Sequence, residues 1–247
     1  MREFSILTAC HNNRQFLPEY FDSVCSQSYP KLEIIFVDDA SNDSSLSYAT
    51  SMAAKDSRIK VISQKTMEYC SSTYANALNH ATGDICGVVD ADDILMPDAV
   101  QKIVNLYKKH PEISFIYTQH YWCNAKMKDC HKGLSAIPKE KSIVESVLAG
   151  QHCFSHWRTF RRLCSEKAVL FPRGLKYSVD KNLGFVLEEV GRGAFCPEAM
   201  YRYRYHKNNM SLTAARRQKK TTRQLAKQFY NKRLENNTMV YQIRKIK

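Results

Sequence analysis

The sequence predicts an α/β fold with a mostly parallel sheet and helices on both faces. Short apolar runs alternate with amphipathic segments along the first half of the chain, which is the order of strand, helix, strand. Residues 32–37 are apolar apart from Glu33 and rich in Ile, as in strands that are covered on both faces. With 247 residues, 44% of them hydrophobic, the chain can bury a substantial core, so we expect one domain with an appendage.

The predicted elements follow one another at regular spacing. The expected strands lie at residues 4–7, 32–37, 59–62, 85–89 and 115–117. Apolar residues that recur three and four positions apart predict helices at residues 17–25, 46–53, 72–81 and 100–107. Gly83 suits the end of the third helix. The apolar face of Leu183, Val186 and Leu187 indicates a later helix.

Polar clusters come directly after three of these strands, at Thr8 to Asn12, Asp38 to Asp43 and Asp90 to Asp93. Ligands of open parallel sheets bind at the carboxyl ends of the strands, so we expect the clusters to share one rim. Neighbouring carboxylates repel each other, and a hard divalent cation with oxygen ligands is a ready source of compensation. The rim therefore predicts a site for Mn²⁺ or Mg²⁺ and a substrate diphosphate.

Helix capping is the alternative interpretation of these acids, and Asp43 and Asp98 suit it. Capping does not explain why Asp90 and Asp92 lie directly behind an apolar run. Capping also does not explain why two aspartates, Asp38 and Asp39, stand next to each other at the end of a second apolar run. We therefore favour ligand binding for these four.

Six segments together carry a resemblance to a known family. They are SILTACHN (5–12), EIIFVDDASND (33–43), AxGD (81–84), VVDADDILMPD (88–98), SVDKNL (178–183) and YRYRYHKNNMS (201–211). In this order the chain resembles family 2 glycosyltransferases, which have the Rossmann-like GT-A fold. The resemblance implies transfer of a sugar from a nucleotide diphosphate sugar, usually a UDP-sugar, with inversion, to a glycan or lipid-linked acceptor in polysaccharide biosynthesis.

The same resemblance implies the domain organisation. A glycosyltransferase domain would cover residues 1–212, with a nucleotide-sugar half at about 1–120 and an acceptor half at about 121–212. Residues 213–247 would form a basic helical tail. The segment 121–172 is rich in Trp, His and Arg, which suits an acceptor wall.

Residue roles are carried over by position. The nucleotide-sugar would be held by Thr8, Ala9, His11, Asn12, one of Asp38 and Asp39, Asp90, Ala91, Arg202 and Arg204. Asp92 would be the direct metal ligand, with His206 joining it from the late basic motif, and Asp180 would be the general base. The chain departs from the family at Ala9, His11 and Val179, where Pro, Tyr and an acid are usual. A helix N-cap is the alternative role for Asp180.

The nine cysteines are scattered without a C-x-x-C pair, and we expect reduced thiols. A zinc site drawn from Cys123, Cys130, His131, His152, Cys153 and His156 fits no usual ligand spacing. No apolar run approaches the ~20 residues of a membrane span. We expect a cytoplasmic protein, at most peripheral at the inner face of a membrane.

The positive charge is concentrated in the tail. From Ala214 to Lys247 there are eleven basic residues and one acid, a net +10 of the total +13, which leaves +3 for the other 213 residues. A narrow apolar stripe recurs there at helical spacing and comprises Thr222, Leu225, Ala226, Phe229, Tyr230 and Leu234. The stripe fits an anionic membrane surface, or packing on its own domain or on another subunit. We expect a chain ending at Leu212 to keep its turnover on a soluble acceptor.

Two other classes of protein share part of this sequence pattern. A nucleotidyltransferase also combines a parallel sheet with acidic metal ligands, but it usually has a Gly-rich phosphate loop, and SILTACHNNRQ contains no glycine. A nucleic-acid-binding protein would need a distributed basic face, which the nearly neutral body does not supply. We expect no nucleic-acid partner.

Overall fold

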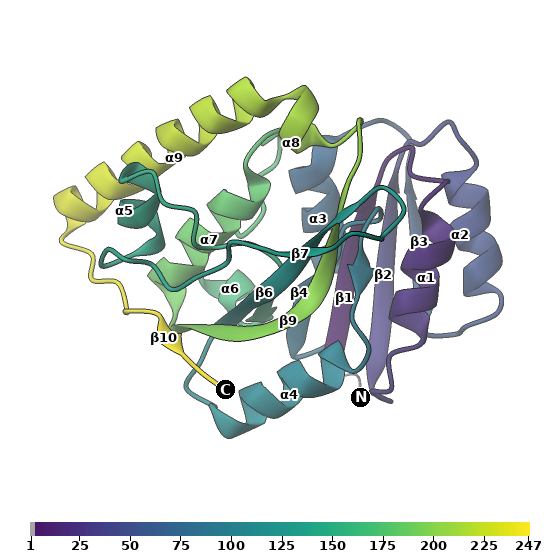
Figure 1. The fold of residues 1–247 in the computed structure, drawn as a ribbon, viewed down its shortest axis with the longest axis horizontal. Helices are drawn as coiled ribbons and strands as arrows, with labels where there is room; N and C mark the ends of the chain where they lie inside the picture. The colour runs from purple at the N-terminus through teal and green to yellow at the C-terminus, as the bar shows by residue number, and fades with distance from the viewer. Residues whose placement is uncertain (1–2) are drawn as a thin grey trace.

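The computed structural model describes residues 3–247, and within them ten strands join in one sheet (Figure 1). The strands are β1 Phe4–Cys10, β2 Leu32–Asp39, β3 Ile59–Gln64, β4 Ile85–Val88, β5 Ile94–Leu95, β6 Phe115–Asn124, β7 His131–Lys132, β8 Arg158–Arg161, β9 Gly193–Tyr205 and β10 Arg244–Lys245. Their order across the sheet is β10-β9-β6-β8-β4-β1-β2-β3, with β5 added to β9 and β7 added to β6. The predicted α/β fold with a mostly parallel sheet is confirmed.

The helices lie on both faces of this sheet. They are α1 Leu17–Cys25, α2 Ser45–Ala53, α3 Tyr69–Asn79, α4 Ala99–Lys109, α5 Ile143–Leu148, α6 Cys164–Lys167, α7 Val179–Val190, α8 Met210–Thr213 and α9 Ala215–Asn236. One core layer packs α1, α2 and α4 against the sheet, and the other packs α3, α5, α6, α7 and α9. The two layers remove both faces of the central strands from water, which accounts for their apolar runs.

The first half of the sheet is parallel. β1 lies between β2 and β4, and β3 extends the sheet beyond β2. The register pairs Thr8 with Phe36 and Leu7 with Val88, so the carboxyl ends of these strands reach the same edge. β2 runs on to Asp39, so Asp38 and Asp39 close the strand instead of following it.

The second half of the sheet departs from the simple alternation. β8 runs antiparallel between β4 and β6, whereas β6 and β9 are parallel to each other. β6 continues seven residues beyond the predicted end at Tyr117. The three residues after Tyr117 are polar but buried, so the short apolar run marks only the inner end of the strand.

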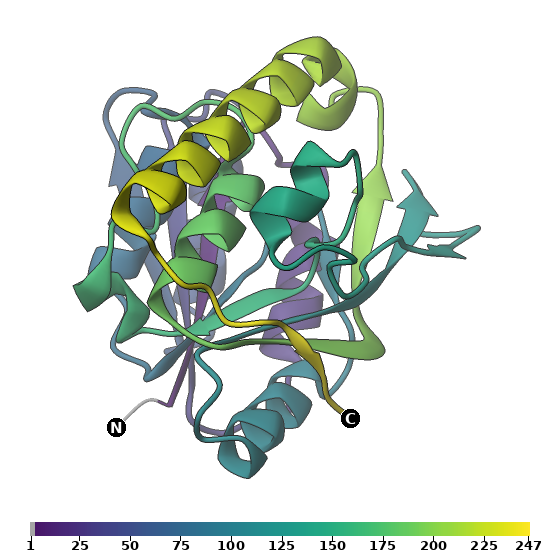
Figure 2. The same ribbon diagram turned by 90° about the vertical axis from the view of Figure 1, so that its left-hand side faces the viewer.

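The tail is a helix that packs on the body. α9 lies along α5 and α7, and the two views place it over the same layer (Figures 1 and 2). Ala226 is fully buried, Leu225 and Phe229 pack against the core layer, and the Phe229 ring lies 5.6 Å from that of Phe185. Tyr230 and Leu234 remain exposed. The structure thus favours packing on its own domain for the inner part of the stripe.

A buried ion pair fixes the far end of α9. Arg233 donates from Nη2 to Glu188 at 2.8 Å and from Nε to Glu189 at 3.1 Å, and both acids belong to α7. The Glu188 carboxylate also accepts the backbone N–H groups of Ile143 and Val144, the first residues of α5. One carboxylate therefore joins three helices.

The expectation that all nine cysteines are reduced thiols is wrong for one pair. Cys123 at the end of β6 and Cys130 just before β7 form a disulfide. A turn in which the Met127 N–H donates to the Asn124 carbonyl brings the chain back on itself, so residues seven apart meet. The zinc site drawn from these cysteines is thereby excluded.

Among the helices of residues 3–247, none has the length and apolar character that crossing a membrane requires.

Candidate active site

One pocket of about 690 Å³ lies at the carboxyl ends of the parallel strands. Loops that follow β1, β2 and β4 form one wall, which includes Asn12, Asp39 and Asp92. The start of α7, the end of β9 and the segment from α8 into α9 form the rest, which includes Asp180 and His206. The pocket thus gathers residues from both ends of the chain at the predicted rim.

The two predicted metal ligands lie together in this pocket. Asp92 Oδ2 is 2.9 Å from His206 Nε2, and both side chains line the cavity. The backbone N–H of His206 donates to Asn209 Oδ1 at 2.5 Å, and the Phe16 ring packs against the imidazole at 4.6 Å. These contacts fix the imidazole in front of the carboxylate, although 114 residues separate the two.

Arg204 and Arg202 take positions that differ from the expected contact with a diphosphate. Arg204 is 1% exposed and donates from Nε to the Asp92 carbonyl and from Nη1 to the Ala125 carbonyl, both at 2.6 Å. Its third nitrogen, Nη2, forms an ion pair with the Glu19 carboxylate. Arg202 pairs with Ile94 across strands β9 and β5 and is not among the residues that line the pocket. β9 alternates its side chains, so Arg204 supports the acidic loop from behind.

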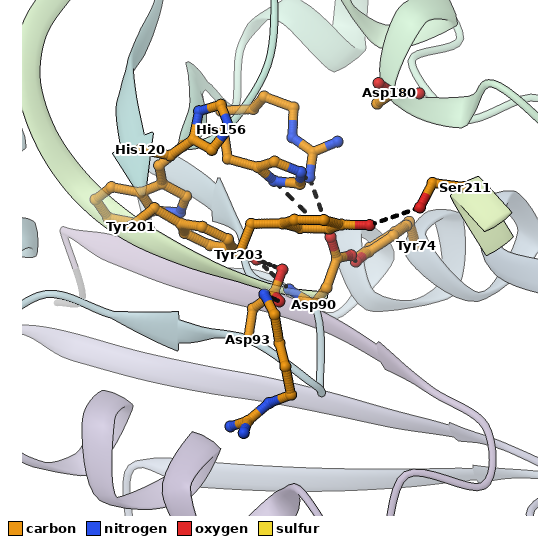
Figure 3. Close-up of polar contacts among 12 residues, drawn as sticks. Tyr74, Asp90, Asp93, His120, His156, Asp180, Tyr201, Tyr203 and Ser211 are labelled. Atoms are coloured by element: carbon orange, nitrogen blue, oxygen red, sulfur yellow. Dashed lines mark hydrogen bonds and ion pairs between the residues drawn. The ribbon is translucent and has the colours of Figure 1, made fainter. Parts of the chain in front are cut away.

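Asp90 lines the pocket, and Asp93 lies enclosed beside it (Figure 3). Asp93 has no exposed surface and accepts from the Tyr201 hydroxyl at 2.8 Å and from the Arg204 N–H at 2.7 Å. Its burial, followed by the charges of Asp92 and Asp90, raises the pKa of Asp93 well above its usual range. Asp90 accepts from the Tyr74 hydroxyl and from Arg158 Nη2, the latter at 3.2 Å.

An aromatic column stands beside Asp90. The His156 ring stacks on Tyr201 at 4.8 Å and on Tyr203 at 5.2 Å, and Arg158 Nη2 lies 2.8 Å from its Nδ1 (Figure 3). Burial lowers the pKa of His156 well below its usual value, and the charge of Arg158 adds to this effect. His156 is therefore neutral at physiological pH, and its Nδ1 can accept from the guanidinium.

Two sets of side chains could hold a divalent cation. Asp90, Asp93 and His156 bring one ligand atom each within 4.8 Å of one another. In that set, the Asp93 oxygens already accept two hydrogen bonds and the Arg158 guanidinium bonds both Asp90 and His156. Asp93 does not line the pocket, whereas Asp92 and His206 both do. A carboxylate oxygen suits Mn²⁺ or Mg²⁺, and an imidazole nitrogen beside it favours Mn²⁺ over Mg²⁺. The second set fits a metal that must also reach a substrate.

The nucleotide-binding residues predicted after β1 and β2 divide between core and pocket. Ala9, His11, Asn12 and Asp39 line the pocket, as Ala91 does in the loop after β4. Thr8 and Asp38 are buried instead, Thr8 Oγ1 at 2.6 Å from the Tyr20 hydroxyl and Asp38 Oδ2 accepting from the Ser41 N–H at 3.0 Å. Strand alternation accounts for the difference because neighbouring side chains face opposite ways.

Asp39 is held in place within the pocket wall. Its Oδ1 accepts from Gln64 Nε2 and from the Glu68 N–H, each at 2.7 Å, while its carbonyl bonds His11 Nδ1 at 2.7 Å. Of the aspartate pair, Asp39 is therefore the one placed to meet a ligand.

Asp180 lies in the first turn of α7 and lines the same pocket. Figure 3 shows it set apart from the Asp90 and Asp93 group. Burial raises the pKa of Asp180, but the charges of Lys181, whose Nζ is 3.6 Å away, and of Arg158 outweigh it and bring the pKa below the usual 3.8. A carboxylate in this state is ionised and able to accept a proton at neutral pH.

Several pocket residues were not identified from the sequence. They are Tyr74, Trp122, Arg158, Tyr203, Gln218 and Thr222. Tyr74 belongs to none of the polar clusters after the strands, and Arg158 is marked only as part of a segment rich in Trp, His and Arg. Gln218 and Thr222 belong to the tail helix, whose sequence does not show that it reaches the pocket.

A mostly parallel α/β sheet with an acidic pocket at the carboxyl ends of its strands is the arrangement of GT-A sugar transferases. The chain belongs to glycosyl transferase family 2, whose sequence model matches residues 5–167.

Known proteins agree with this assignment. The chain is 36% identical over 206 residues to the putative glycosyltransferase EpsE of Bacillus subtilis, covering 81% of this chain and 72% of that protein. TarS of S. aureus, residues 1–349 in complex with UDP-GlcNAc, aligns with a TM-score of 0.70 at 16% identity, over 94% of this chain and 73% of that one. A Pyrobaculum calidifontis mannosyltransferase in complex with GDP-Man and Mn²⁺ aligns with a TM-score of 0.62 at 17% identity, over 88% and 61%. At these identities the two structures show the shared fold.

Proposed function

We propose that this protein transfers a sugar from a UDP-sugar to a hydroxyl group of a glycan or lipid-linked acceptor, with inversion at the anomeric carbon. The observation that carries the proposal is that Asp92 with His206 and Asp180 line one pocket from separate elements. An inverting displacement needs charge stabilisation on the side of the leaving diphosphate and a base on the side of the attacking hydroxyl. Two separate acidic positions meet that need.

The donor would lie against the loops after β1, β2 and β4. Asn12, His11 and Asp39 would hold the nucleoside, and Asp92 and His206 would hold Mn²⁺ or Mg²⁺. The cation would supply positive charge to the leaving diphosphate. The complexes of TarS with UDP-GlcNAc and of the mannosyltransferase with GDP-Man and Mn²⁺ support a nucleotide-sugar donor, and the first supports UDP.

In the reaction, the acceptor hydroxyl attacks the anomeric carbon as its proton passes to Asp180. A new carbon–oxygen bond forms, the bond between the sugar and the diphosphate breaks, and a nucleoside diphosphate leaves with the bonding electrons. The lowered pKa of Asp180 keeps this carboxylate ionised before the reaction. We also propose a donor half at about residues 1–120 and an acceptor half at about 121–212, from which His206 reaches the metal of the donor half.

The acceptor would enter past an aromatic surface. Trp122 is 45% exposed and Tyr205 41% exposed, and their rings stack at 5.7 Å. Trp122 also lines the pocket and lies 5.6 Å from Tyr203. Flat apolar faces of this kind suit the apolar face of a pyranose ring, which supports a glycan acceptor.

The outer face of α9 supports attachment to an anionic surface on the cytoplasmic side of a membrane. Its exposed cations are Arg216, Arg217, Lys219, Lys220, Arg223, Lys227 and Lys232. Each cation close to anionic lipid contributes about 1 kcal/mol. Co-sedimentation with phosphatidylserine vesicles at low salt is expected. Concentration-dependent self-association without vesicle binding would instead assign Tyr230 and Leu234 to a contact with a second copy.

The test is a screen of nucleotide sugars with Mn²⁺ present and the released nucleotide measured. We expect nucleoside diphosphate from the correct donor, and faster release with acceptor. Asp180→Asn is expected to lower transfer by about 10²- to 10⁴-fold with donor affinity unchanged, because the base acts on the acceptor. Release of inorganic diphosphate would contradict the proposal and favour a nucleotidyltransferase.

A further inference from the structure

Ser178 stands two residues before Asp180 in an unusual conformation. It is the residue that precedes helix α7. Its φ of 59° lies in the left-handed region, which residues other than Gly rarely adopt. A serine at this place normally accepts a hydrogen bond from the first turn of its own helix. Ser178 makes no such bond.

The hydrogen-bonding groups of Ser178 are directed to α9 instead. Its Oγ donates to the Gln218 carbonyl at 2.9 Å and lies 2.7 Å from Thr222 Oγ1. Its backbone N–H donates to Gln218 Oε1 at 3.3 Å. Because the single hydroxyl proton of Ser178 goes to the carbonyl, the Thr222 hydroxyl is the donor in the second contact. One turn of α9 therefore holds the residue that sets the start of α7.

The same turn of α9 reaches the pocket. Ala215, Gln218 and Thr222 all line the cavity that contains Asp180. Farther along α9, Arg233 binds Glu188 and Glu189, so the two helices are joined at both ends of their contact. Asp180 is thus carried on a helix that the tail contacts at both ends.

We propose that Gln218 and Thr222 are positioning residues that hold Asp180 in place through Ser178, so that residues 215–222 belong to the catalytic unit. This inference rests on the proposed function, in which Asp180 is the general base. It also replaces the expectation that a chain ending at Leu212 keeps its turnover, because such a chain lacks both partners of Ser178.

Paired substitutions at Thr222 test the inference. Thr222→Val keeps the shape and loses the hydroxyl, and Thr222→Ser keeps the hydroxyl. We expect kcat to fall about tenfold or more in Thr222→Val, because misplacing a reacting group by about 1 Å can cost 100-fold. KM for the nucleotide sugar is expected to change less than about twofold, since Asp180 does not hold the donor. Thr222→Ser should restore kcat.

Gln218→Ala should show a smaller loss of kcat, because it removes the bond from the Ser178 N–H to Gln218 Oε1 and keeps the backbone carbonyl that accepts from Ser178 Oγ. Thr221→Val is the matched control, because Thr221 neighbours Thr222 and is not among the residues that line the pocket. Unchanged kcat in both Thr222→Val and Gln218→Ala would overturn the inference. An equal rise in donor KM would also overturn it, because the residues would then act on donor binding.

Hydrogen exchange of the backbone separates this inference from the proposed function. Amides at residues 178–183 should exchange faster in Thr222→Val and Gln218→Ala than in the unmodified protein and in Thr221→Val, whether or not a substrate is known. Unchanged exchange would overturn the positioning role. Faster exchange in a protein that transfers no sugar would leave the link between the helices standing and remove the proposed function.

Discussion

The two walls of the pocket are built in different ways. On the donor wall, Asn12, Asp39 and Asp92 follow neighbouring parallel strands, so the sheet itself sets their spacing. On the other wall, Asp180 and Thr222 are brought in by helix packing and by hydrogen bonds between distant segments. The geometry of the first wall therefore depends on residues at the ends of neighbouring strands, and that of the second wall depends on tertiary contacts with the tail.

Removing the metal ligand should break the donor wall with the largest effect. Asp92→Asn is expected to lower transfer by about 10²- to 10³-fold, because charge stabilisation at the leaving group is lost. The circular dichroism spectrum should stay unchanged. Asp84→Asn, at an exposed acid outside the pocket, is the control. Full activity in the presence of a chelator would rule out the metal site.

Breaking the buried ion pair between Arg233 and Glu188 should destabilise the contact between α9 and α7, which carries the second wall. Arg233→Met leaves Glu188, which is 1% exposed, without its cation and should lower the free energy of unfolding by about 3 kcal/mol. The exposed neighbour serves as control in Lys232→Met, which should change little. Denaturant unfolding measures both. Adding Glu188→Gln to Arg233→Met should recover part of the loss, and no recovery would show that charge is not the cause.

Substitutions in the exposed aromatic surface should change binding of the acceptor and leave binding of the donor unchanged. Trp122→Ala is expected to raise KM for the acceptor by about 2- to 13-fold, because an aromatic stacking contact contributes about 0.5–1.5 kcal/mol. KM for the donor should stay constant. Trp122→Phe retains a stacking face and should lie between the two. A rise in donor KM of the same size would place Trp122 on the donor wall.

The stability of the protein in acid should depend on Glu33, which lies on one of the strands that carry the donor wall. Glu33 is buried on β2 and accepts from Ser5 Oγ and the Thr82 N–H, each at 2.6 Å, and from the Gly83 N–H at 3.1 Å. Burial raises the pKa of Glu33, but these hydrogen bonds outweigh it, and the pKa lies below the usual 4.5.

A lowered pKa means that the Glu33 carboxylate stabilises the fold above about pH 4.5 and that this contribution is lost as the pH falls through the folded-state value. The stability gap between the unmodified protein and Glu33→Gln should therefore be widest near neutral pH and shrink in acid. Urea unfolding from pH 3 to pH 7 measures the gap. A constant gap would mean that Glu33 acts without its charge.

The sequence could predict the first wall because strand ends in a parallel sheet carry their own signal. The polar residues at strand ends, among them Asn12, Asp39 and Asp92, line one pocket, whereas Asp180 was expected there only from the family resemblance. Side-chain direction was not predictable at the same level, since Arg204 and Thr8 point away from the pocket although their neighbours line it.

The second wall depended on contacts that no short motif contains. The stripe on α9 was visible as a helical period, but a narrow stripe does not say what covers it. Cys123 and Cys130 gave no spacing signal, because the turn between them forms only when β6 extends past Tyr117. Ser178 resembles an ordinary helix cap in the sequence, and only its neighbours on α9 show otherwise.

The distance along the chain between Ser178 and Thr222 has a consequence for biogenesis. A ribosome releases the segment that contains Asp180 before it releases α9. During that interval the nascent chain already carries the loops after β1, β2 and β4, while the start of α7 still lacks its partners on α9. The start of α7 would therefore reach its final geometry only after α9 has been released, which delays turnover until that point.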